Sequence, residues 1–313
     1  MISRNQSDDK SFKSGFITLV GRSNVGKSTL LNSLVGTKIA AVTDKPQTTR
    51  NIIHGVLNFP AGFDENSPEA FGQAVFVDTP GVFKEHHNSL SGKLTERVRE
   101  ALHNIDMILY VADPSKSLGA EERYTLSLVR NLEIPKLLII NKSDLPDDEK
   151  PYLEDYRALT SDFNSVFELS ALRNRHIQPL KQKVFELLPH GEPAYPENQL
   201  TNIDERFWVA EIVREKIFKA LRKEVPYTTH VEVTNIELRD DAVNGKKPDA
   251  GVYVIDATIF TFDSRYKKMI IGAGGRAIKE IGIAARKELA AALNKKVYLN
   301  LEVETDKHWQ ERA

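Results

Sequence analysis

The 313-residue sequence contains no cysteine, which excludes disulfide scaffolds, thiolate metal sites and cysteine nucleophiles. It also lacks any run of about 18 apolar residues, the length that a membrane-spanning helix needs. Neither sign of charge dominates, because 43 Lys and Arg residues are balanced by 44 Asp and Glu residues, for a net charge of −1. A uniformly basic chain is therefore excluded, and any nucleic-acid surface must be local. The mostly polar residues before Phe16 do not resemble a signal peptide, so a cytoplasmic protein is expected.

What is present is the composition of a globular protein, with 41% hydrophobic and 28% charged residues. Because single hydrophobic cores stop growing at roughly 250–300 residues, a chain of this length predicts two domains. The sequence pattern changes after Leu188, where a proline-rich stretch begins. The expected divisions are a flexible tail at 1–13, a first domain at 14–188, a linker at 189–202 and a second domain at 203–313.

In the first domain, short β-rich segments alternate with longer helical patterns. Such alternation predicts an α/β fold with a mostly parallel sheet and crossover helices. A strand at 51–59 is joined to the strand at 73–77 by a loop containing proline, glycine and acidic residues, which predicts an antiparallel hairpin within this sheet. The other predicted strands are 16–20, 107–113, 136–140 and 165–169.

The second domain has a different pattern, in the order helix, strand, strand, helix, helix, strand, which predicts a smaller α+β domain. Its first helix, expected at 204–223, carries one apolar stripe that is most simply explained by core packing. The stripe consists of Phe207, Ala210, Val213, Ile217 and Leu221. Residues 261–300 hold nine Lys or Arg against three Asp or Glu, and this local excess predicts an anionic partner. The strands are expected at 228–239, 252–260 and 297–303, with two short helices beside Gly272 to Gly275.

The segment GRSNVGKS lies between the first predicted strand and a helical pattern, and it fits the phosphate-binding pattern G-x-x-x-x-G-K-[ST]. Glycines suit this P-loop because its backbone N–H groups must turn inward around phosphate oxygens. The helix that follows directs the positive end of its dipole to the same anion. Lys27 is expected to reach the β- and γ-phosphates, and the Ser28 hydroxyl to bind Mg²⁺. The residues expected to surround the phosphates are Gly21, Arg22, Ser23, Asn24, Val25, Gly26, Lys27, Ser28 and Thr29.

A P-loop does not by itself distinguish GTP from ATP, so the base-reading residues decide. NKSD at 141–144 follows a predicted strand, at the sheet edge where open α/β sheets bind ligands. The Asp144 carboxylate can accept two parallel hydrogen bonds from guanine N1–H and the 2-amino group, a pair that adenine does not present. Asn141 is expected to tie this loop to the P-loop, and the stem of Lys142 to lie against the base. The pattern predicts a GTP and GDP site.

A short polar segment after the strand at 165–169 completes the base site. Ser170 and Ala171, followed by Leu172, are expected to offer a backbone N–H to guanine O6. Because the segment follows the next parallel strand, it should lie at the same sheet edge as the NKSD loop.

The metal and the γ-phosphate have their own candidates. DTPG ends the strand at 73–77, so the Asp78 carboxylate can hold Mg²⁺ and the Gly81 N–H can meet the γ-phosphate; Thr79 and Pro80 lie between them. The hydroxyls of Thr48 and Thr49 are further oxygen ligands of the kind that Mg²⁺ prefers. The predicted metal ligands are Ser28, Thr49 and Asp78.

Together these five motifs resemble those of a translation-factor-class GTPase. By that resemblance Thr49, just before Arg50, matches the switch threonine better than Thr48, and Val82 replaces the glutamine that orients water in many members. Asn24 is similar to an asparagine that helps hold a monovalent cation in potassium-stimulated members, so K⁺ is a further expected cofactor. The resemblance implies a slow GTPase whose catalytic residues are Lys27, Thr49, Gly81 and Asn24.

The second domain contains MIIGAGGRAIKEIG, in which the pattern G-x-x-G joins two helical segments. A glycine-edged turn lets single-stranded RNA approach the backbone, and nearby cations neutralise its phosphates. Four isoleucines, Ile270, Ile271, Ile278 and Ile281, are expected to form a floor for the bases. The predicted RNA-binding residues are Lys267, Lys268, Ile270, Ile271, Gly272, Ala273, Gly274, Gly275, Arg276 and Lys279.

The whole combination resembles the Era GTPases, in which a GTPase domain precedes a K-homology (KH) domain of the second type. The likeness extends beyond the nucleotide motifs to PQTTR, AYPENQLTN, FWVAEIVREKIF, PYTTHVEV and KKVYLNLEV. It implies a GTPase that binds the 3′ end region of 16S ribosomal RNA and assists maturation of the 30S subunit. It also implies a monomer that makes peripheral contact with the membrane. RNA binding is then expected to depend on whether GTP or GDP is bound.

Three departures from the family pattern are visible, and two other functions stay open. The loop at 58–72 is long, Ala273 replaces a common lysine, and the last strand carries Glu302, Glu304 and Asp306. One alternative is a membrane-associated regulatory GTPase switch that acts on protein partners, its basic segment attracted to anionic lipid. Another is a GTPase tied to RNA modification, which is weakened because no site for modification chemistry lies outside the first domain.

Overall fold

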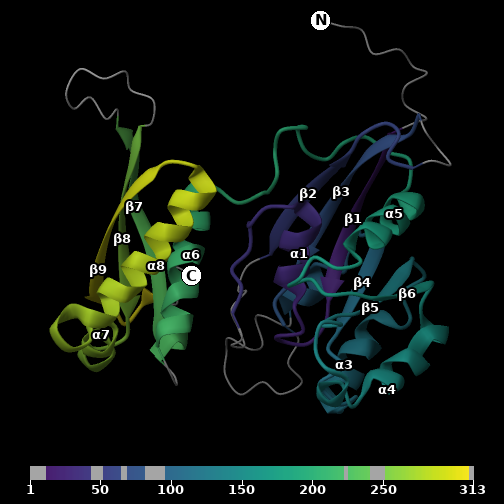
Figure 1. Cartoon of the computed structure of the whole chain (residues 1–313), viewed down its shortest axis with the longest axis horizontal. Helices are drawn as coiled ribbons and strands as arrows, with labels where there is room; N and C mark the ends of the chain where they lie inside the picture. The colour runs from purple at the N-terminus through teal and green to yellow at the C-terminus, as the bar shows by residue number, and fades with distance from the viewer. Residues whose placement is uncertain are drawn as a thin grey trace, which may run out of the picture. The chain divides into compact units, whose positions relative to one another are not determined.

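The computed structural model describes residues 12–43, 52–64, 69–81, 96–221, 225–239 and 251–309 (Figure 1). The chain divides into two compact units. Among the described residues, the first unit contains 12–40 and 52–202, and the second contains 41–43 and 203–309. No helix in these described ranges is both long enough and apolar enough to cross a membrane.

The first unit contains a six-stranded sheet with the order β2-β3-β1-β4-β5-β6. Only β2 runs antiparallel to its neighbour β3, and the other pairs are parallel, which confirms the predicted hairpin and the mostly parallel sheet. The strands are β1 (Phe12–Val20), β2 (Ile53–Phe59), β3 (Phe71–Asp78), β4 (Met107–Ala112), β5 (Lys136–Ile140) and β6 (Ser165–Glu168). The first strand begins at Phe12 rather than Phe16, because Phe12 pairs with Phe71 at the end of the long hairpin.

Helices in this unit follow strands as the crossover pattern requires. They are α1 (Lys27–Val35), α3 (Ala120–Val129), α4 (Leu153–Arg157) and α5 (Ile177–Leu187). Every residue of β4 is buried, as expected for a parallel strand covered on both faces. Tyr110 from β4, Val129 from α3 and Tyr156 from α4 share one core cluster, which fixes α3 against the centre of the sheet.

The segment predicted as a linker, 189–202, is attached to the sheet of the first unit. Its N-terminal end follows β1, where the Ser14 N–H donates to the Pro189 oxygen at 2.9 Å. Its C-terminal end follows β2, where the Val56 N–H donates to the Leu200 oxygen at 2.9 Å and the His54 N–H to Asn202 Oδ1 at 2.8 Å. Between these ends, the Gln73 amide pairs with the backbone of Tyr195 at 2.9 Å in both directions.

The long hairpin loop that departs from the family pattern contributes to the core near its start. Phe63 packs edge-on against Phe59, with ring centroids 4.7 Å apart, and against Phe185 of α5 at 5.6 Å. The start of this loop therefore brings an aromatic side chain to the junction of β2 and α5.

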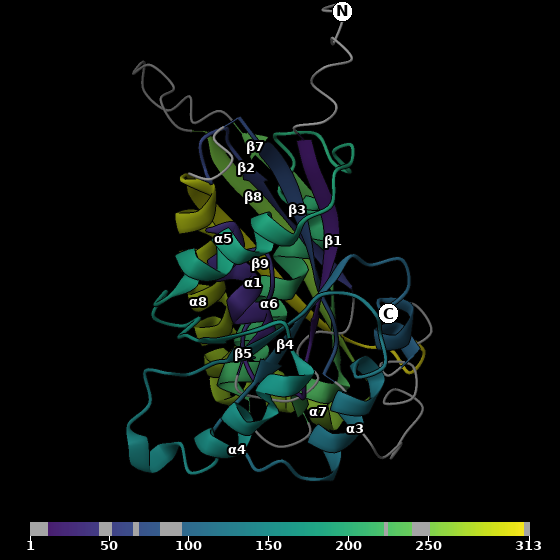
Figure 2. The same cartoon turned by 90° about the vertical axis from the view of Figure 1, so that its right-hand side faces the viewer.

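The second unit contains a three-stranded sheet, β7-β8-β9, in which β7 is antiparallel and β9 parallel to β8. Helices α6 and α8 lie side by side against this sheet (Figures 1 and 2). The elements are α6 (Glu205–Ala220), β7 (Thr229–Arg239), β8 (Val252–Thr261), α7 (Ser264–Ile271), α8 (Arg276–Leu293) and β9 (Lys296–Thr305). Their order confirms the predicted α+β pattern.

The first helix of this unit, α6, buries charge as well as the predicted apolar residues. Val213 and Ile217 lie in the core cluster, as expected. Arg214 is 3% exposed and pairs with Glu211, and its Nε lies 2.7 Å from Glu211 Oε1. Lys216 is buried as well and pairs with Glu215 at 2.8 Å. These two cations of α6 are therefore paired with carboxylates of the same helix.

Candidate functional site

Two glycines of the P-loop are required by close packing. Gly26 has φ 101°, a left-handed conformation that disfavours side chains, and a Cβ there would lie 2.3 Å from Asn141 Nδ2. A Cβ on Gly21 would lie 2.3 Å from the backbone oxygen of Val111. Helix α1 begins directly after Gly26 and ends at Gly36, whose φ is 82°. The P-loop thus turns from β1 into α1 in the way that the sequence pattern predicts.

Lys27 is almost completely buried within this loop. Its ammonium donates to the backbone oxygens of Gly21 at 3.0 Å and Arg22 at 2.9 Å. Burial lowers the pKa of Lys27 to about 8, although the nearby carboxylates of Asp78 and Glu122 act to raise it. The structure therefore places a desolvated ammonium group at the N-terminus of α1. A bound anion would interact strongly with this charge, because little water screens it and the helix dipole acts in the same direction.

The predicted metal ligands from two motifs lie together. The Ser28 hydroxyl donates to Asp78 Oδ2 at 2.5 Å. Thr79 Oγ1 donates to the Leu19 oxygen at 2.8 Å, which secures the start of the DTPG segment against β1. Within the described ranges, no three His, Cys, Asp or Glu side chains cluster as a metal site. A hydroxyl and a carboxylate oxygen nevertheless fit Mg²⁺, which binds few protein ligands and completes its shell with phosphates and water.

Gly81 brings the DTPG segment against the P-loop. A Cβ on Gly81 would lie 2.7 Å from Ser23 Cα, so only glycine allows this approach. Pro80 precedes it at the same sheet edge. Thr48, Thr49 and Val82, which the sequence assigns to the switch segments, lie outside the described residues.

The NKSD loop is fastened to its neighbours by its first two side chains. Asn141 Nδ2 donates to the Val25 oxygen at 2.9 Å, which is the expected tie to the P-loop. The Lys142 ammonium reaches Asp113 Oδ2 at 2.5 Å. Asp113 is buried and directly follows β4, and Asp78 likewise ends β3. Asp113 was not predicted as a site residue, although its position after a buried strand is a signal that could have found it.

Asp144, the predicted guanine reader, is held ready by the segment after β6. The Ser170 hydroxyl donates to Asp144 Oδ1 at 2.5 Å, and Arg173 Nε lies 3.9 Å from its other oxygen. The Ala171 N–H donates to Asn141 Oδ1 at 3.0 Å, so this predicted donor to guanine O6 has an internal partner. Leu172 follows with 71% of its surface exposed.

In the second unit, the G-x-x-G turn joins α7 to α8 in a left-handed conformation. Gly272, Gly274 and Gly275 have φ angles of 72°, 59° and 75°, whereas Ala273 lies at the one position that tolerates a side chain. Arg276 starts α8 directly after the turn. The backbone of the turn is therefore available to a close ligand, at the N-terminal end of an 18-residue helix.

Basic side chains surround this turn. Lys268, Arg276 and Lys279 are exposed, and Lys267 is half-buried. Within the described part of the chain, none of these four forms an ion pair. They differ in this respect from the cations of α6 and are available to neutralise phosphate charge.

The isoleucine floor requires a correction. Ile270 and Ile281 are wholly buried in the hydrophobic core of the second unit and cannot contact bases directly. Ile271 and Ile278 are only partly buried. The helical period explains the division, because residues one position apart on α7 point to different sides of the helix. Of the four isoleucines, only Ile271 and Ile278 are exposed enough to contact bases. Both pack against the core cluster that contains Ile270 and Ile281.

These geometries define a class of protein, a P-loop GTPase domain followed by a KH domain. Family models agree: the model described as a 50S ribosome-binding GTPase matches residues 16–142, and the KH domain model matches 213–310. GTPase Era of Heliobacterium modesticaldum is 37% identical over 302 residues, covering 96% of this chain and 94% of the relative. GTPase Era of Thermoanaerobacter sp. is 38% identical over 307 residues, with the same coverage.

Solved structures show the same likeness over both units. A crystal structure of Era in complex with MgGDPNP and nucleotides 1506–1542 of 16S ribosomal RNA matches with TM-score 0.82 and 32% identity, covering 96% of each chain. A single-residue variant of Aquifex aeolicus Era bound to GDP.AlF4- matches with TM-score 0.81, 32% identity and the same coverage. The chain belongs to the GTPase Era family and is a GTP-hydrolysing enzyme.

Proposed function

We propose that this GTPase binds the 3′ end region of 16S ribosomal RNA through its KH unit and assists maturation of the 30S subunit. The observation that carries the proposal is the presence, in one chain, of an NKSD loop tied to the P-loop and a basic G-x-x-G turn whose flanking cations form no ion pair within the described residues. The likeness to Era bound to nucleotides 1506–1542 of 16S ribosomal RNA, which covers 96% of both chains, supports the choice of RNA.

At the nucleotide site, internal contacts support the proposed roles. Asp144, which accepts a hydrogen bond from Ser170, would accept hydrogen bonds from the guanine edge, and Lys27, now held by backbone oxygens, would bind phosphate oxygens. Ser28, Asp78 and Thr49 would hold Mg²⁺, which when bound stabilises charge on the phosphates. The Gly81 N–H would position the γ-phosphate.

A potassium ion is part of the same proposal. Asn24 has φ 64° and therefore presents its amide from a left-handed position in the P-loop. Its side chain would help hold K⁺ against the phosphates, where Val82 offers no amide to orient the attacking water. Stimulation of GTP hydrolysis by K⁺ over Na⁺ tests this assignment, and equal rates in the two salts would reject it.

The RNA role rests on the basic turn. The partly buried Ile271 and Ile278 provide apolar contact, and Lys268, Arg276 and Lys279 meet the phosphates. Because the cations are solvated until RNA arrives, affinity should fall steeply with salt.

Nucleotide and RNA binding are proposed to be energetically coupled. Linkage requires that if GTP tightens RNA binding, RNA tightens GTP binding by the same factor. Equal RNA affinities with GDP and with a non-hydrolysable GTP analogue would eliminate coupling and leave the two binding functions intact.

The deciding experiment measures three properties of the purified protein. We expect GTP to be bound and hydrolysed in preference to ATP, and single-stranded 16S 3′-end RNA to be retained at low salt. RNA crosslinked to the protein in cells should be enriched in that same region. Retention of unrelated single-stranded RNA with equal affinity, or crosslinks elsewhere, would contradict the proposed RNA partner.

A further inference from the structure

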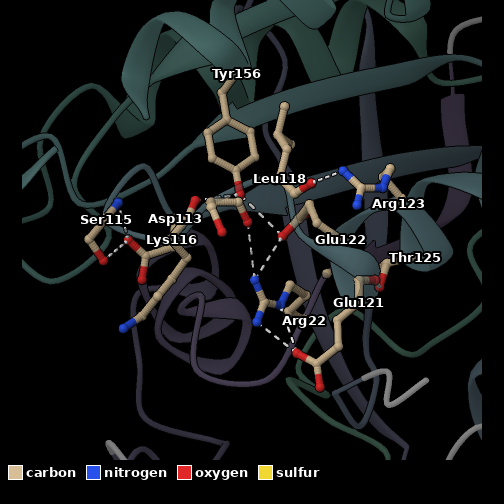
Figure 3. A network of polar contacts seen from close by, with 12 residues as sticks. Arg22, Asp113, Ser115, Lys116, Leu118, Glu121, Glu122, Arg123, Thr125 and Tyr156 are labelled. Carbon is tan, nitrogen blue, oxygen red and sulfur yellow. Dashed lines mark hydrogen bonds and ion pairs between the residues drawn. The ribbon is translucent and has the colours of Figure 1, made fainter. Parts of the chain in front are cut away.

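Two carboxylates at the start of α3 lie against the P-loop, although neither belongs to a nucleotide-binding motif (Figure 3). Arg22 Nε and Nη2 contact Glu121 Oε2 at 3.0 and 2.7 Å. Arg22 Nη1 lies 3.8 Å from Glu122 Oε2 and 3.4 Å from the backbone oxygen of Ser117. The guanidinium of a P-loop residue is thus surrounded by acceptors from one helix and the turn before it.

Glu122 is the more unusual of the two carboxylates, because its side chain is fully buried. Tyr156 OH donates to Glu122 Oε2 at 3.1 Å, and Tyr110 OH donates to Oε1. Burial raises the pKa of the Glu122 carboxyl, whereas the two hydroxyls and the Arg22 guanidinium act to lower it. A buried carboxylate is costly unless it is paired and hydrogen-bonded, and this one has fixed partners from β4, α4 and the P-loop.

The Arg22 backbone links this cluster to the phosphate site. Its carbonyl oxygen accepts a hydrogen bond from the Lys27 ammonium at 2.9 Å. Two residues later, Asn24 adopts φ 64°, a left-handed conformation that Asn adopts more readily than most other residues but less readily than glycine. Contacts made by neighbouring residues help to keep such a stretch in place, and the Arg22 side chain makes contacts of this kind with Glu121.

We propose that Glu121 and Glu122, acting through Arg22, are positioning residues that keep the first half of the P-loop in its phosphate-gripping form. The inference rests on the proposed nucleotide site and adds two residues to it. Both carboxylates contact the Arg22 guanidinium, so no direct contact with the nucleotide is assigned to them. Their contribution is preorganisation, which strengthens binding of the β-phosphate because less ordering is needed when nucleotide arrives.

The test compares GDP with GMP, because both carry guanine but only GDP has the β-phosphate that the P-loop grips. Affinities for both are measured for the full chain and for Arg22→Met, Glu121→Gln and Glu122→Gln. Arg130→Met is the matched control, because Arg130 pairs with Asp162 at 2.7 Å in the same unit without any P-loop contact.

Arg22→Met should lower GDP affinity about tenfold, because it removes a partly buried guanidinium that donates two hydrogen bonds to Glu121 Oε2, and leave GMP affinity within about twofold. Arg22→Lys, which keeps the charge but not the fork, should recover part of the loss. Glu121→Gln and Glu122→Gln should raise the KM for GTP while kcat at saturation is retained, and Arg130→Met should change neither nucleotide affinity.

Equal losses of GDP and GMP affinity would overturn the proposal, because they would indicate general damage rather than loosening at the phosphates. Unchanged GDP affinity in the variants would overturn it as well. If Glu122→Gln fails to fold, Glu121→Gln decides, since the Glu121 side chain is 43% exposed. Failure of the wild type to prefer GDP over GMP would instead reject the proposed nucleotide site.

Discussion

Lys27 in the P-loop and Lys268 beside the G-x-x-G turn are both expected to meet phosphate, yet their surroundings differ. Lys27 is 6% exposed and is held by two backbone oxygens. Lys268 is exposed and, within the described residues, forms no ion pair. At the P-loop, folding itself desolvates and orients the charged group, which costs free energy before the ligand binds. At the G-x-x-G turn, the charged groups stay in contact with water until the ligand binds.

This difference predicts how each surface discriminates. A preorganised, desolvated site can reject a ligand that lacks one hydrogen-bond partner by roughly 10⁴ to 10⁵, because its own polar groups are then left unpaired. An exposed basic turn gains affinity mainly by releasing counterions, which depends on salt and little on sequence. Guanine selectivity should be sharp in the same way, because the Asp144 carboxylate is oriented in advance by the Ser170 hydroxyl, whereas RNA selectivity must come from base contacts beside the turn.

The largest expected effect is at the base-reading carboxylate. Asp144→Asn replaces the acceptor of two guanine hydrogen bonds by an amide and should lower GDP affinity about thousandfold. Xanthine has a carbonyl where guanine has its 2-amino group, so the variant should gain affinity for XDP. Fluorescent-nucleotide titration measures both. RNA affinity without nucleotide should not change, and a variant that still prefers GDP to XDP would contradict the assignment.

A matched pair of glycine substitutions comes next. Gly26→Ala places a methyl group 2.3 Å from Asn141 Nδ2 at φ 101°, so the tie between the P-loop and the NKSD loop must break. We expect a loss of about 2–4 kcal/mol in the free energy of unfolding of the first unit. Gly274→Ala has no atom within 4 Å of the new Cβ and should cost only about 1 kcal/mol, from its φ of 59°.

Urea unfolding followed by probes in each unit measures the two glycine effects. GDP binding should be lost with Gly26→Ala and kept with Gly274→Ala. RNA binding should instead be weakened more by Gly274→Ala than by Gly26→Ala. Similar costs at both positions would mean that close packing does not distinguish the two loops.

Salt dependence separates the sites further. For single-stranded RNA, each phosphate contact contributes about −0.7 to the slope of log affinity against log salt concentration. Lys267→Gln combined with Lys268→Gln should therefore reduce the magnitude of that slope by about 1.4. Lys219→Gln is the control, because Lys219 pairs with Glu215 at 2.6 Å. An unchanged slope in the double variant would show that these lysines do not meet phosphate.

The smallest expected effect concerns the sheet of the second unit. Asn300 Nδ2 donates to Asp256 Oδ1 at 2.7 Å, and this bond, followed by that from Asn235, lowers the pKa of Asp256 below its usual 3.8. A carboxylate with a lowered pKa in the folded state adds stability above its unfolded pKa and loses it as the pH falls through the folded value. Asn300→Ala should therefore cost at most about 0.5 kcal/mol near neutral pH, a small value because water screens this exposed pair.

At a pH below the lowered pKa that Asp256 has in the folded state, the same substitution should cost almost nothing, because Asp256 is then protonated in both the folded and the unfolded state. Urea unfolding at the two pH values measures the difference. Glu302→Gln, a neighbour on β9, should not alter the contribution of Asp256. An equal cost of Asn300→Ala at both pH values would show that the bond does not depend on the carboxylate charge.

Much of the fold was accessible from local sequence patterns. The buried strands of the first unit read as continuous apolar runs, because both faces of a parallel sheet are covered. The strand at 136–140 was predicted with the bounds that the structure shows. The start of β1 was missed, since Phe12 becomes part of the strand only by pairing with Phe71, the first residue of β3 and distant in the sequence.

The segment 189–202 illustrates a second limit. Its prolines and lack of periodicity indicate a linker, and nothing local reveals that it follows β1 and β2. The bond from the His54 N–H to Asn202 Oδ1 joins residues 148 positions apart. Long-range hydrogen bonding of this kind leaves no periodic signal in either partner.

For the sites, the sequence by itself determined which chemical groups are present and in what order, because phosphate and guanine recognition depend on glycine conformations and polar groups at fixed local spacing. Tertiary structure alone decided which groups are buried, such as Ile270, and which meet across the fold, such as Arg22 and Glu122. Burial and pairing depend on the packing of elements distant in the chain, and that packing sets the cost and the strength of every charge in the site.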